Sequence, residues 1–276
     1  MTASHSALLS RLCIHTMTTK PWSLATCVRE YERAGVPAIT VWRQVLDAEG
    51  IAALKASSLR VTALCRGGFF PAIDAVGRQK ALDDNRRAID EAAAIGAPAV
   101  VLVCGAVPGL PLTEARQHIA DGIAAVLPHA RANGVKLSIE PLHPQYAADR
   151  SAVNTMAQAR RICQQVNSAG SNDVGIAVDA YHVWWDDSLE AELQLAGAQG
   201  WIHAFHVCDW KTQQADVLND RGLMGDGCID LLGMRRMVEA AGFTGDIEVE
   251  VFSNRYWAMD QNAYLAQVIQ AFKNHL

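Results

Sequence analysis

Short apolar runs alternate with longer helical patterns along the whole chain, and this alternation constrains the fold more than any other feature. After each run, apolar residues recur every three to four positions, which indicates an amphipathic helix. Strands and helices in this order favour parallel strands joined by right-handed crossovers. The predicted strands are 12–16, 38–42, 60–65, 97–105, 135–140, 174–179, 201–207 and 246–252, and the predicted helices are 23–35, 46–57, 83–96, 113–134, 154–166, 188–197, 231–242 and 262–276.

Eight strand–helix units predict a closed (β/α)8 barrel, an α/β fold of the TIM type, with residues 1–276 as a single domain. The chain length of 276 residues suits that fold. An open, doubly wound sheet is the alternative. It is disfavoured because the first turn from strand to helix, HTMTTKPWS, lacks the GxGxxG phosphate loop.

Composition and charge predict a small ligand. The net charge is −5 and the pI is near 6.0, without the basic patch that nucleic acid or an anionic membrane usually needs. No apolar run is long enough to span a bilayer, and the first residues lack the pattern of a signal peptide. The seven cysteines include no CxxC pair. They are interpreted as reduced thiols of a cytoplasmic protein, with a zinc–cysteine site as the alternative.

Ionisable residues lie at the ends of four successive predicted strands. Glu140 and Asp179 close the fifth and sixth, and His206 and Glu250 lie near the ends of the seventh and eighth. The active site of such a barrel forms at the carboxyl ends of its strands. Three carboxylates there repel one another, and no lysine or arginine adjoins any of the four. We therefore expect one divalent metal ion, first Mn²⁺, with Mg²⁺, Co²⁺ or Zn²⁺ as alternatives.

Each of these residues also has an ordinary structural interpretation. Asp179 could cap a short turn, and His206 could be a histidine of the core. Glu248 alternates with Glu250 on one strand face, and Glu250 is preferred because it lies nearer the end of the strand. His203 is out of phase with His206 and is expected in the core or facing outward. The coincidence on four strands is what favours a metal site.

Motifs spread over nearly the whole chain suggest a family. They are GVPAITVWR (35–43), LCRGGFF (64–70), LSIEPLHP (137–144), VDAYHVWW (178–185), FHVCD (205–209), GDGCIDL (225–231) and IEVEVFSNRYW (247–257). With them the chain resembles the xylose-isomerase-like superfamily of sugar phosphate isomerases and epimerases, which includes ketose 3-epimerases, inosose dehydratase and endonuclease IV. The resemblance implies a TIM barrel, a homodimer, and one divalent metal bound by Glu140, Asp179, His206 and Glu250. It also implies that His182 contacts the substrate.

The sequence departs from two branches of this superfamily. Ketose 3-epimerases carry an arginine shortly after the metal-binding histidine, whereas the nearest basic residues here are Lys211 and Arg221. Endonuclease IV needs a richer set of histidines and acids for three metals, together with a surface that accepts DNA, and neither is visible in this sequence. We therefore expect no nucleic acid as a partner.

The candidate residues suit proton abstraction next to the carbonyl of a small carbohydrate, through an enediolate stabilised by the metal. Glu140 and Glu250 are the candidate catalytic residues, because each could remove or return that proton. The candidate substrate-binding residues are His182, His15, Arg66 and Arg221. Arg66 has the alternative role of pairing with a carboxylate at the rim. No phosphate loop is present, so a phosphorylated substrate is not indicated.

The predicted function is therefore that of a metal-dependent sugar isomerase or epimerase. A lyase or dehydratase that acts by elimination on a keto-sugar or keto-glycoside passes through the same intermediate and is the first alternative. A non-catalytic sugar-binding or partner subunit is the second. An open cleft lined by tryptophans would favour the lyase, and a tight polar pocket closed by a loop would favour the isomerase.

Overall fold

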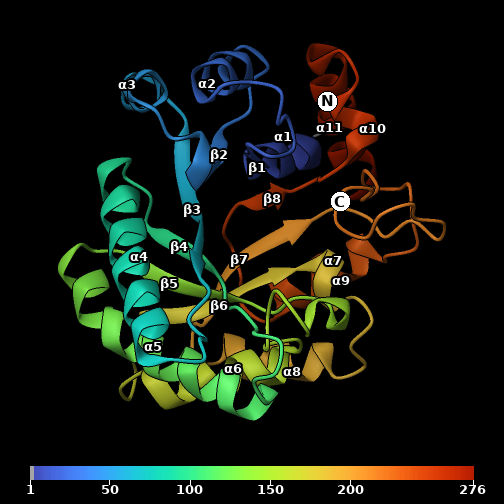
Figure 1. Ribbon diagram of the computed structural model, residues 1–276. Coiled ribbons are helices and arrows are strands. Elements are labelled where there is room, and N and C mark those ends of the chain that lie inside the picture. Colours follow the sequence, from blue (N-terminus) through green and yellow to red (C-terminus); the bar gives the residue numbers. More distant parts are fainter. Residues whose placement is uncertain (1–2) are drawn as a thin grey trace.

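The computed structural model describes residues 3–276, with side chains from residue 6 onward. Eight parallel strands close into a barrel in chain order, and the helices lie around its outside (Figure 1). The predicted (β/α)8 barrel is therefore confirmed. The strands are β1 (Leu12–His15), β2 (Ala38–Trp42), β3 (Arg60–Gly68), β4 (Ala99–Val103), β5 (Lys136–Glu140), β6 (Val174–Asp179), β7 (Ile202–Val207) and β8 (Ile247–Val249).

The helices fall close to their predicted positions, with one clear exception. Helix α4 begins at Ala75 rather than at residue 83, because Asp74 caps it by accepting a hydrogen bond from the backbone N–H of Gly77. The helices are α1 (Ala3–Leu9), α2 (Leu24–Arg33), α3 (Ala48–Ala56), α4 (Ala75–Ala94), α5 (Leu112–Ala132), α6 (Met156–Val166), α7 (Ala180–Val183), α8 (Leu189–Gly197), α9 (Leu231–Ala240), α10 (Asn254–Trp257) and α11 (Gln261–His275), with the 3₁₀ turns η1 (Arg43–Val45) and η2 (Pro144–Tyr146). Among the described residues, no helix combines the length and the apolar character needed to cross a membrane.

Strand β8 is shorter than predicted and ends before Glu250. The backbone N–H of Glu250 still donates to the carbonyl of Val207, at 3.1 Å, so the ladder to β7 continues one residue past the assigned strand. This bond holds Glu250 at the carboxyl end of the barrel, beside the end of β7. The position expected for its side chain is therefore kept although the strand is shorter.

Small side chains leave the lower half of the barrel interior open. TIM barrels usually fill this space with bulky branched residues. Here Ala63, Ala99, Ser138 and Ala204 face a cavity of about 310 Å³ at the amino-terminal mouth. The cavity lies at the opposite end of the strands from the carboxyl rim.

His203 lines this cavity because β7 contains an irregularity. Ile176 pairs with Ile202 but Ala177 pairs with Ala204, so His203 is the extra residue of a bulge. Its Nδ1 lies 3.0 Å from Oγ of Ser138 on β5. The side chain of His203 therefore points into the barrel, and the expected outward orientation is wrong. Alternation alone does not predict this orientation because a bulge shifts the register by one residue.

Candidate metal centre

Four side chains from four neighbouring strands meet at the carboxyl end of the barrel. Glu140, Asp179, His206 and Glu250 each offer one ligand atom, and these four atoms all lie within 4.8 Å of one another. Every one of the four residues is at most 4% exposed. The strand register explains the meeting, because Asp179 at the end of β6 pairs directly with His206 on β7.

Two carboxylates flank the imidazole of His206. Its Nδ1 lies 3.1 Å from Oε1 of Glu140, and its Nε2 lies 3.4 Å from Oε2 of Glu248. Glu248 also accepts a hydrogen bond from the hydroxyl of Thr40. Nδ1 thus lies beside Glu140, another member of the four, while Glu248 lies on the Nε2 side of the ring. A carboxylate behind a histidine fixes its tautomer and orientation in many metal sites.

The role of Glu248 was not predicted from the sequence. We considered it only as a rival of Glu250 for the rim. Both side chains point into the barrel, since residues two apart in a strand share a face. Glu248 lies one layer deeper and contacts His206 instead. The sequence did contain a signal for this role. Two glutamates that alternate on one strand predict two inward-facing side chains at different depths in the barrel as readily as one side chain at the rim.

The acids of this cluster are costly to ionise without a cation. Burial raises the pKa of Asp179 to about 7 and also raises the pKa of Glu140. Burial alone would lower the pKa of His206, but the carboxylates of Glu248 and Glu140 outweigh it and raise this pKa to about 10. Three carboxylate oxygens and one imidazole nitrogen form a donor set that suits a divalent cation of hard or borderline character. The residues present therefore fit such an ion.

A basic side chain, that of Arg221, contacts two of the four candidate ligands. The expectation that no lysine or arginine adjoins them was therefore wrong. Nη1 of Arg221 lies 3.1 Å from Oε2 of Glu250 and 3.5 Å from Oδ2 of Asp179. Its guanidinium is held over the rings of Tyr181 and Phe252, at 4.4 and 4.8 Å from their centroids. Arg221, a predicted substrate-binding residue, comes from the long segment between β7 and α9, so its contact with the two acids could not be predicted from proximity in the sequence.

Asp209 holds that segment over the barrel. Its carboxylate accepts hydrogen bonds from the backbone N–H groups of Trp210, Gly225, Gly227 and Ile229. An isolated bridge pairs Asp209 with Gly222, directly after Arg221. Asp209 thereby positions the turn that carries Arg221. Sequence reasoning noted the motif FHVCD but assigned no role to its aspartate.

Burial alone would raise the pKa of Glu250, but positive neighbours outweigh it and lower this pKa. His15, Arg221 and His206 all act in that direction. Burial lowers the pKa of His15 to about 4, so this imidazole is neutral near pH 7. Near pH 7, the positive charges that lower the pKa of Glu250 therefore belong to Arg221 and His206.

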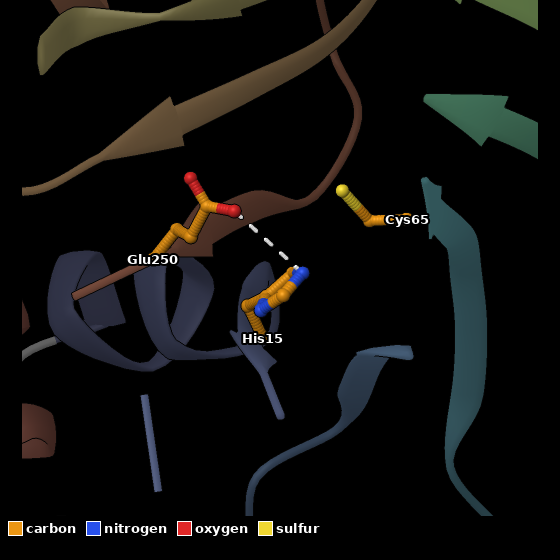
Figure 2. Close-up of side chains that lie close together, drawn as sticks. All are labelled: His15, Cys65 and Glu250. Atoms are coloured by element: carbon orange, nitrogen blue, oxygen red, sulfur yellow. Dashed lines mark ion pairs between the residues drawn. The ribbon is translucent and has the colours of Figure 1, made fainter. Parts of the chain in front are cut away.

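His15 forms a second three-residue grouping with Cys65 and Glu250, and all three are buried (Figure 2). The Nδ1 atom of His15 accepts a hydrogen bond from the backbone N–H of Met17, at 3.0 Å. The neutral ring must then carry its proton on Nε2, which lies 3.6 Å from Oε1 of Glu250. An N–H group cannot ligate a metal, so this grouping is suited to holding Glu250 rather than to binding a second ion.

His182 has the same tautomer for the same reason. Its Nδ1 accepts from the backbone N–H of His143 at 3.2 Å, and its Nε2 lies 3.5 Å from Oδ2 of Asp179. Burial and then the charge of Arg221 lower the pKa of His182. His182 therefore presents a neutral ring to the edge of the candidate metal centre, where its Nε2 also lies 3.5 Å from Nη2 of Arg221.

The cavity above these groups is small and is lined by both apolar and polar side chains. It measures about 40 Å³, and Leu218 from the segment between β7 and α9 is one of its lining residues. Arg66 lines it, with its guanidinium over the rings of Phe69 and Trp42 at 4.3 and 5.4 Å from their centroids. Within the described part of the chain, no rim carboxylate pairs with Arg66. Other lining residues are Glu140, Glu250, Tyr146, Arg150, His182 and Arg221.

Curated relatives of the chain include isomerases. An inosose isomerase of Halalkalibacterium halodurans is 26% identical over 195 residues, which are 69% of this chain and 66% of that protein. The inosose isomerase of Bacillus subtilis is 27% identical over 150 residues, which are 53% of this chain and 50% of that protein. The chain thus spans between half and about two thirds of the length of these relatives.

Solved structures share the fold over nearly the full chain. Protein SMc04130 from Sinorhizobium meliloti 1021 is 47% identical, with a TM-score of 0.92 over 97% of this chain and 98% of that one. The IOLI protein with a bound zinc atom is 21% identical, with a TM-score of 0.82 over 96% of this chain and 99% of that one. Residues 28–275 match the family model described as xylose isomerase-like TIM barrel. The chain therefore belongs to the xylose isomerase-like TIM barrel family.

Proposed function

We propose that this protein is a divalent-metal-dependent sugar isomerase or epimerase, which moves a proton at the carbon next to a carbonyl through an enediolate. The observation that carries the proposal is the buried set of three carboxylates and one imidazole at the carboxyl end of the barrel. The naming of curated relatives as inosose isomerases supports the reaction class.

Glu140, Asp179, Glu250 and Nδ1 of His206 would hold one ion. Mn²⁺ is our first choice, and Mg²⁺, Co²⁺ and Zn²⁺ are alternatives, with zinc supported by the ion in the IOLI protein. When bound, the ion polarises the substrate carbonyl and stabilises the negative charge of the enediolate. It would also offset the charge of the three buried carboxylates.

The side chains around that ion divide the remaining work. Glu140 and Glu250 remove and return the proton, and the position of its return decides between epimerisation and isomerisation. The Nε2–H of His182 and the guanidinium of Arg221 donate hydrogen bonds to substrate oxygens. Nε2 of His15 lies 3.6 Å from Oε1 of Glu250, and Nη1 of Arg221 lies 3.1 Å from Oε2. Leu218, from the segment between β7 and α9, lines the same pocket.

The buried carboxylates favour an enzyme over a non-catalytic subunit. A subunit that only binds sugar has no need of three buried carboxylates, which cost free energy to bury. Assembly as a homodimer, a location in the cytoplasm and the single-domain organisation stay predictions.

Metal analysis and proton exchange test the proposal together. The purified chain is expected to bind about one divalent ion. The loaded protein is then incubated with keto-sugars in D₂O, and NMR is used to detect deuterium at the carbon next to the carbonyl. Deuterium uptake with an epimer or isomer as product supports the proposal, whereas an elimination product would establish the lyase. Absence of metal binding under every loading condition would overturn the four-ligand assignment.

A further inference from the structure

We propose that the substrate carries an anionic oxygen group, a carboxylate or a phosphate, and that Arg66 and Arg150 bind it at the mouth of the candidate active-site pocket. This inference rests on the proposed function, because it takes the pocket above the candidate metal centre as the substrate site. It narrows the substrate class from sugars in general to acidic sugar derivatives.

The two arginines reach the same pocket from different segments. Arg66 lies near the carboxyl end of β3, and Arg150 lies in the loop that follows β5 and η2. Both line the cavity that Glu140 and Glu250 also line. Burial lowers the pKa of Arg66, and the positive charge of Arg150 adds to this effect. Both guanidinium groups therefore lie along one pocket, and no described carboxylate separates them by pairing with either.

Neither guanidinium has an acidic partner within residues 3–276. Aromatic faces support them instead, since Arg66 lies over Phe69 and Trp42, and Arg150 lies 5.7 Å from the ring centroid of Tyr146. A ring holds a guanidinium in place without neutralising it. The half-buried Arg160, by contrast, pairs with Glu192. Arg66 and Arg150 thus bring two guanidinium groups without a described acidic partner to one pocket.

Nearby acids are already engaged. The carboxylate of Asp84 acts on Arg66 from a distance, but it pairs with Arg43 at 2.8 Å. Deeper in the pocket, Arg221 and the divalent ion together would match the three ligand carboxylates in charge. Arg66 and Arg150 are therefore not needed to neutralise the metal centre, and their charge is available to a ligand.

Tyr146 adds an independent observation. Its hydroxyl is buried, and it has no hydrogen-bond partner in the described part of the chain. The side chain lines the same cavity, beside Arg150. A buried hydroxyl without a partner costs free energy that a ligand oxygen recovers. Two guanidinium groups and one hydroxyl form a set of donors that suits an anionic oxygen group.

The chemistry of arginine favours an anion over a neutral hydroxyl. A guanidinium binds carboxylate or phosphate oxygens through two parallel N–H bonds, and such charge-assisted bonds are about twice as strong as neutral ones. A neutral ketose would leave both positive charges uncompensated beside the pocket. An acidic sugar derivative would compensate them and would be oriented with its carbonyl toward the metal centre.

The test compares three substrates on one carbon skeleton: a neutral ketose, the corresponding keto-sugar acid, and the corresponding phosphate ester. The metal-loaded protein is assayed with each for deuterium uptake from D₂O and for kcat/KM. We expect one anionic compound to be preferred, and its identity distinguishes carboxylate from phosphate. Arg66→Gln and Arg150→Gln should each lower kcat/KM for it by at least ~10-fold, and by clearly more than for the neutral ketose. Arg66→Lys should lose less than Arg66→Gln.

Arg236→Gln, on the exposed side of α9, serves as the matched control and should leave the preference unchanged. The inference would be overturned if the parent protein turned over the neutral ketose and Arg66→Gln lowered kcat/KM equally for all three substrates. The proposed function would still stand in that case. Failure of every substrate would instead count against the proposed function. In that case, thermal-shift titration with inorganic phosphate and with malonate still decides the inference. Stabilisation of the parent protein that is lost in Arg66→Gln and Arg150→Gln supports it, and no stabilisation overturns it.

Discussion

The guanidinium of Arg221 lies 3.1 Å from the carboxylate of Glu250, which is also one of the four candidate metal ligands. With an ion bound, this carboxylate would face two positive partners, a fixed guanidinium and an exchangeable cation. Like charges in a buried site repel. We therefore expect the arginine to weaken the binding of an ion at this centre.

Replacement of Arg221 should separate metal binding from turnover. Arg221→Gln removes a positive charge beside the ion, so we expect divalent-metal affinity to rise by on the order of 10-fold, which corresponds to about 1.4 kcal/mol. Turnover should fall, because a donor to the substrate is lost. Calorimetric metal titration and steady-state kinetics measure the two effects. Weaker metal binding in this variant would show that Arg221 organises the carboxylates rather than competing with the ion.

Glu140→Gln and Glu250→Gln should each abolish turnover. Each change removes a metal ligand and a proton carrier while it keeps nearly the same shape. We expect kcat to drop by at least ~10³-fold. Loss of a proton carrier alone typically costs ~10²–10⁴-fold, and here a metal ligand is lost as well. Rates are to be measured at saturating metal, with Glu49→Gln on the exposed face of α3 as the control. Full activity in either variant would refute the mechanism with two carboxylates.

Glu248→Gln tests the carboxylate behind His206. It cannot ligate the ion from its deeper layer, but it orients the imidazole through Nε2 at 3.4 Å. We expect metal affinity to fall by ~10–100-fold, as for other groups that orient a ligand histidine. Excess metal should restore activity in Glu248→Gln and should fail to do so in Glu250→Gln. No difference between these two variants would contradict the layered arrangement.

His182→Ala should affect the substrate more than the metal. The Nε2–H of His182 lies beside Asp179 at the edge of the metal centre. We expect a rise in KM or a fall in kcat/KM of ~10-fold or more, with metal content close to one ion per chain. Metal content by atomic spectroscopy is the deciding measurement. Loss of the ion from this variant would assign His182 to the support of Asp179 instead.

The contribution of His203 to the free energy of unfolding should fall as the pH drops from about 6.5 toward 4. Burial lowers the pKa of His203 from 6.5 to about 4, so the unfolded chain takes up a proton in this range while the folded chain does not. Urea unfolding at pH 7 and pH 5 measures the effect. His203→Gln should make the free energy of unfolding less dependent on pH between these two values. An unchanged pH dependence in His203→Gln would exclude His203 as a source.

The barrel and the meeting of four candidate ligands could be predicted from the sequence. Strand and helix periodicities are local properties, and eight alternating units leave few ways to close a parallel sheet. Parallel strands also deliver their last residues to one rim, so Glu140, Asp179 and His206 could be placed together without coordinates. The boundaries were less certain, as the early start of α4 and the short β8 illustrate.

Only the tertiary structure decided what surrounds those ligands. Arg221 arrives from a long segment whose path depends on hydrogen bonds to Asp209, and no local pattern encodes such a path. The bulge at His203 and the deeper layer of Glu248 depend on register between strands. The tautomers of His15 and His182 depend on single backbone N–H groups. Periodicity along a chain determines which residues face the interior, whereas the depth, partners and charge balance of each are set by contacts between segments that are distant in sequence.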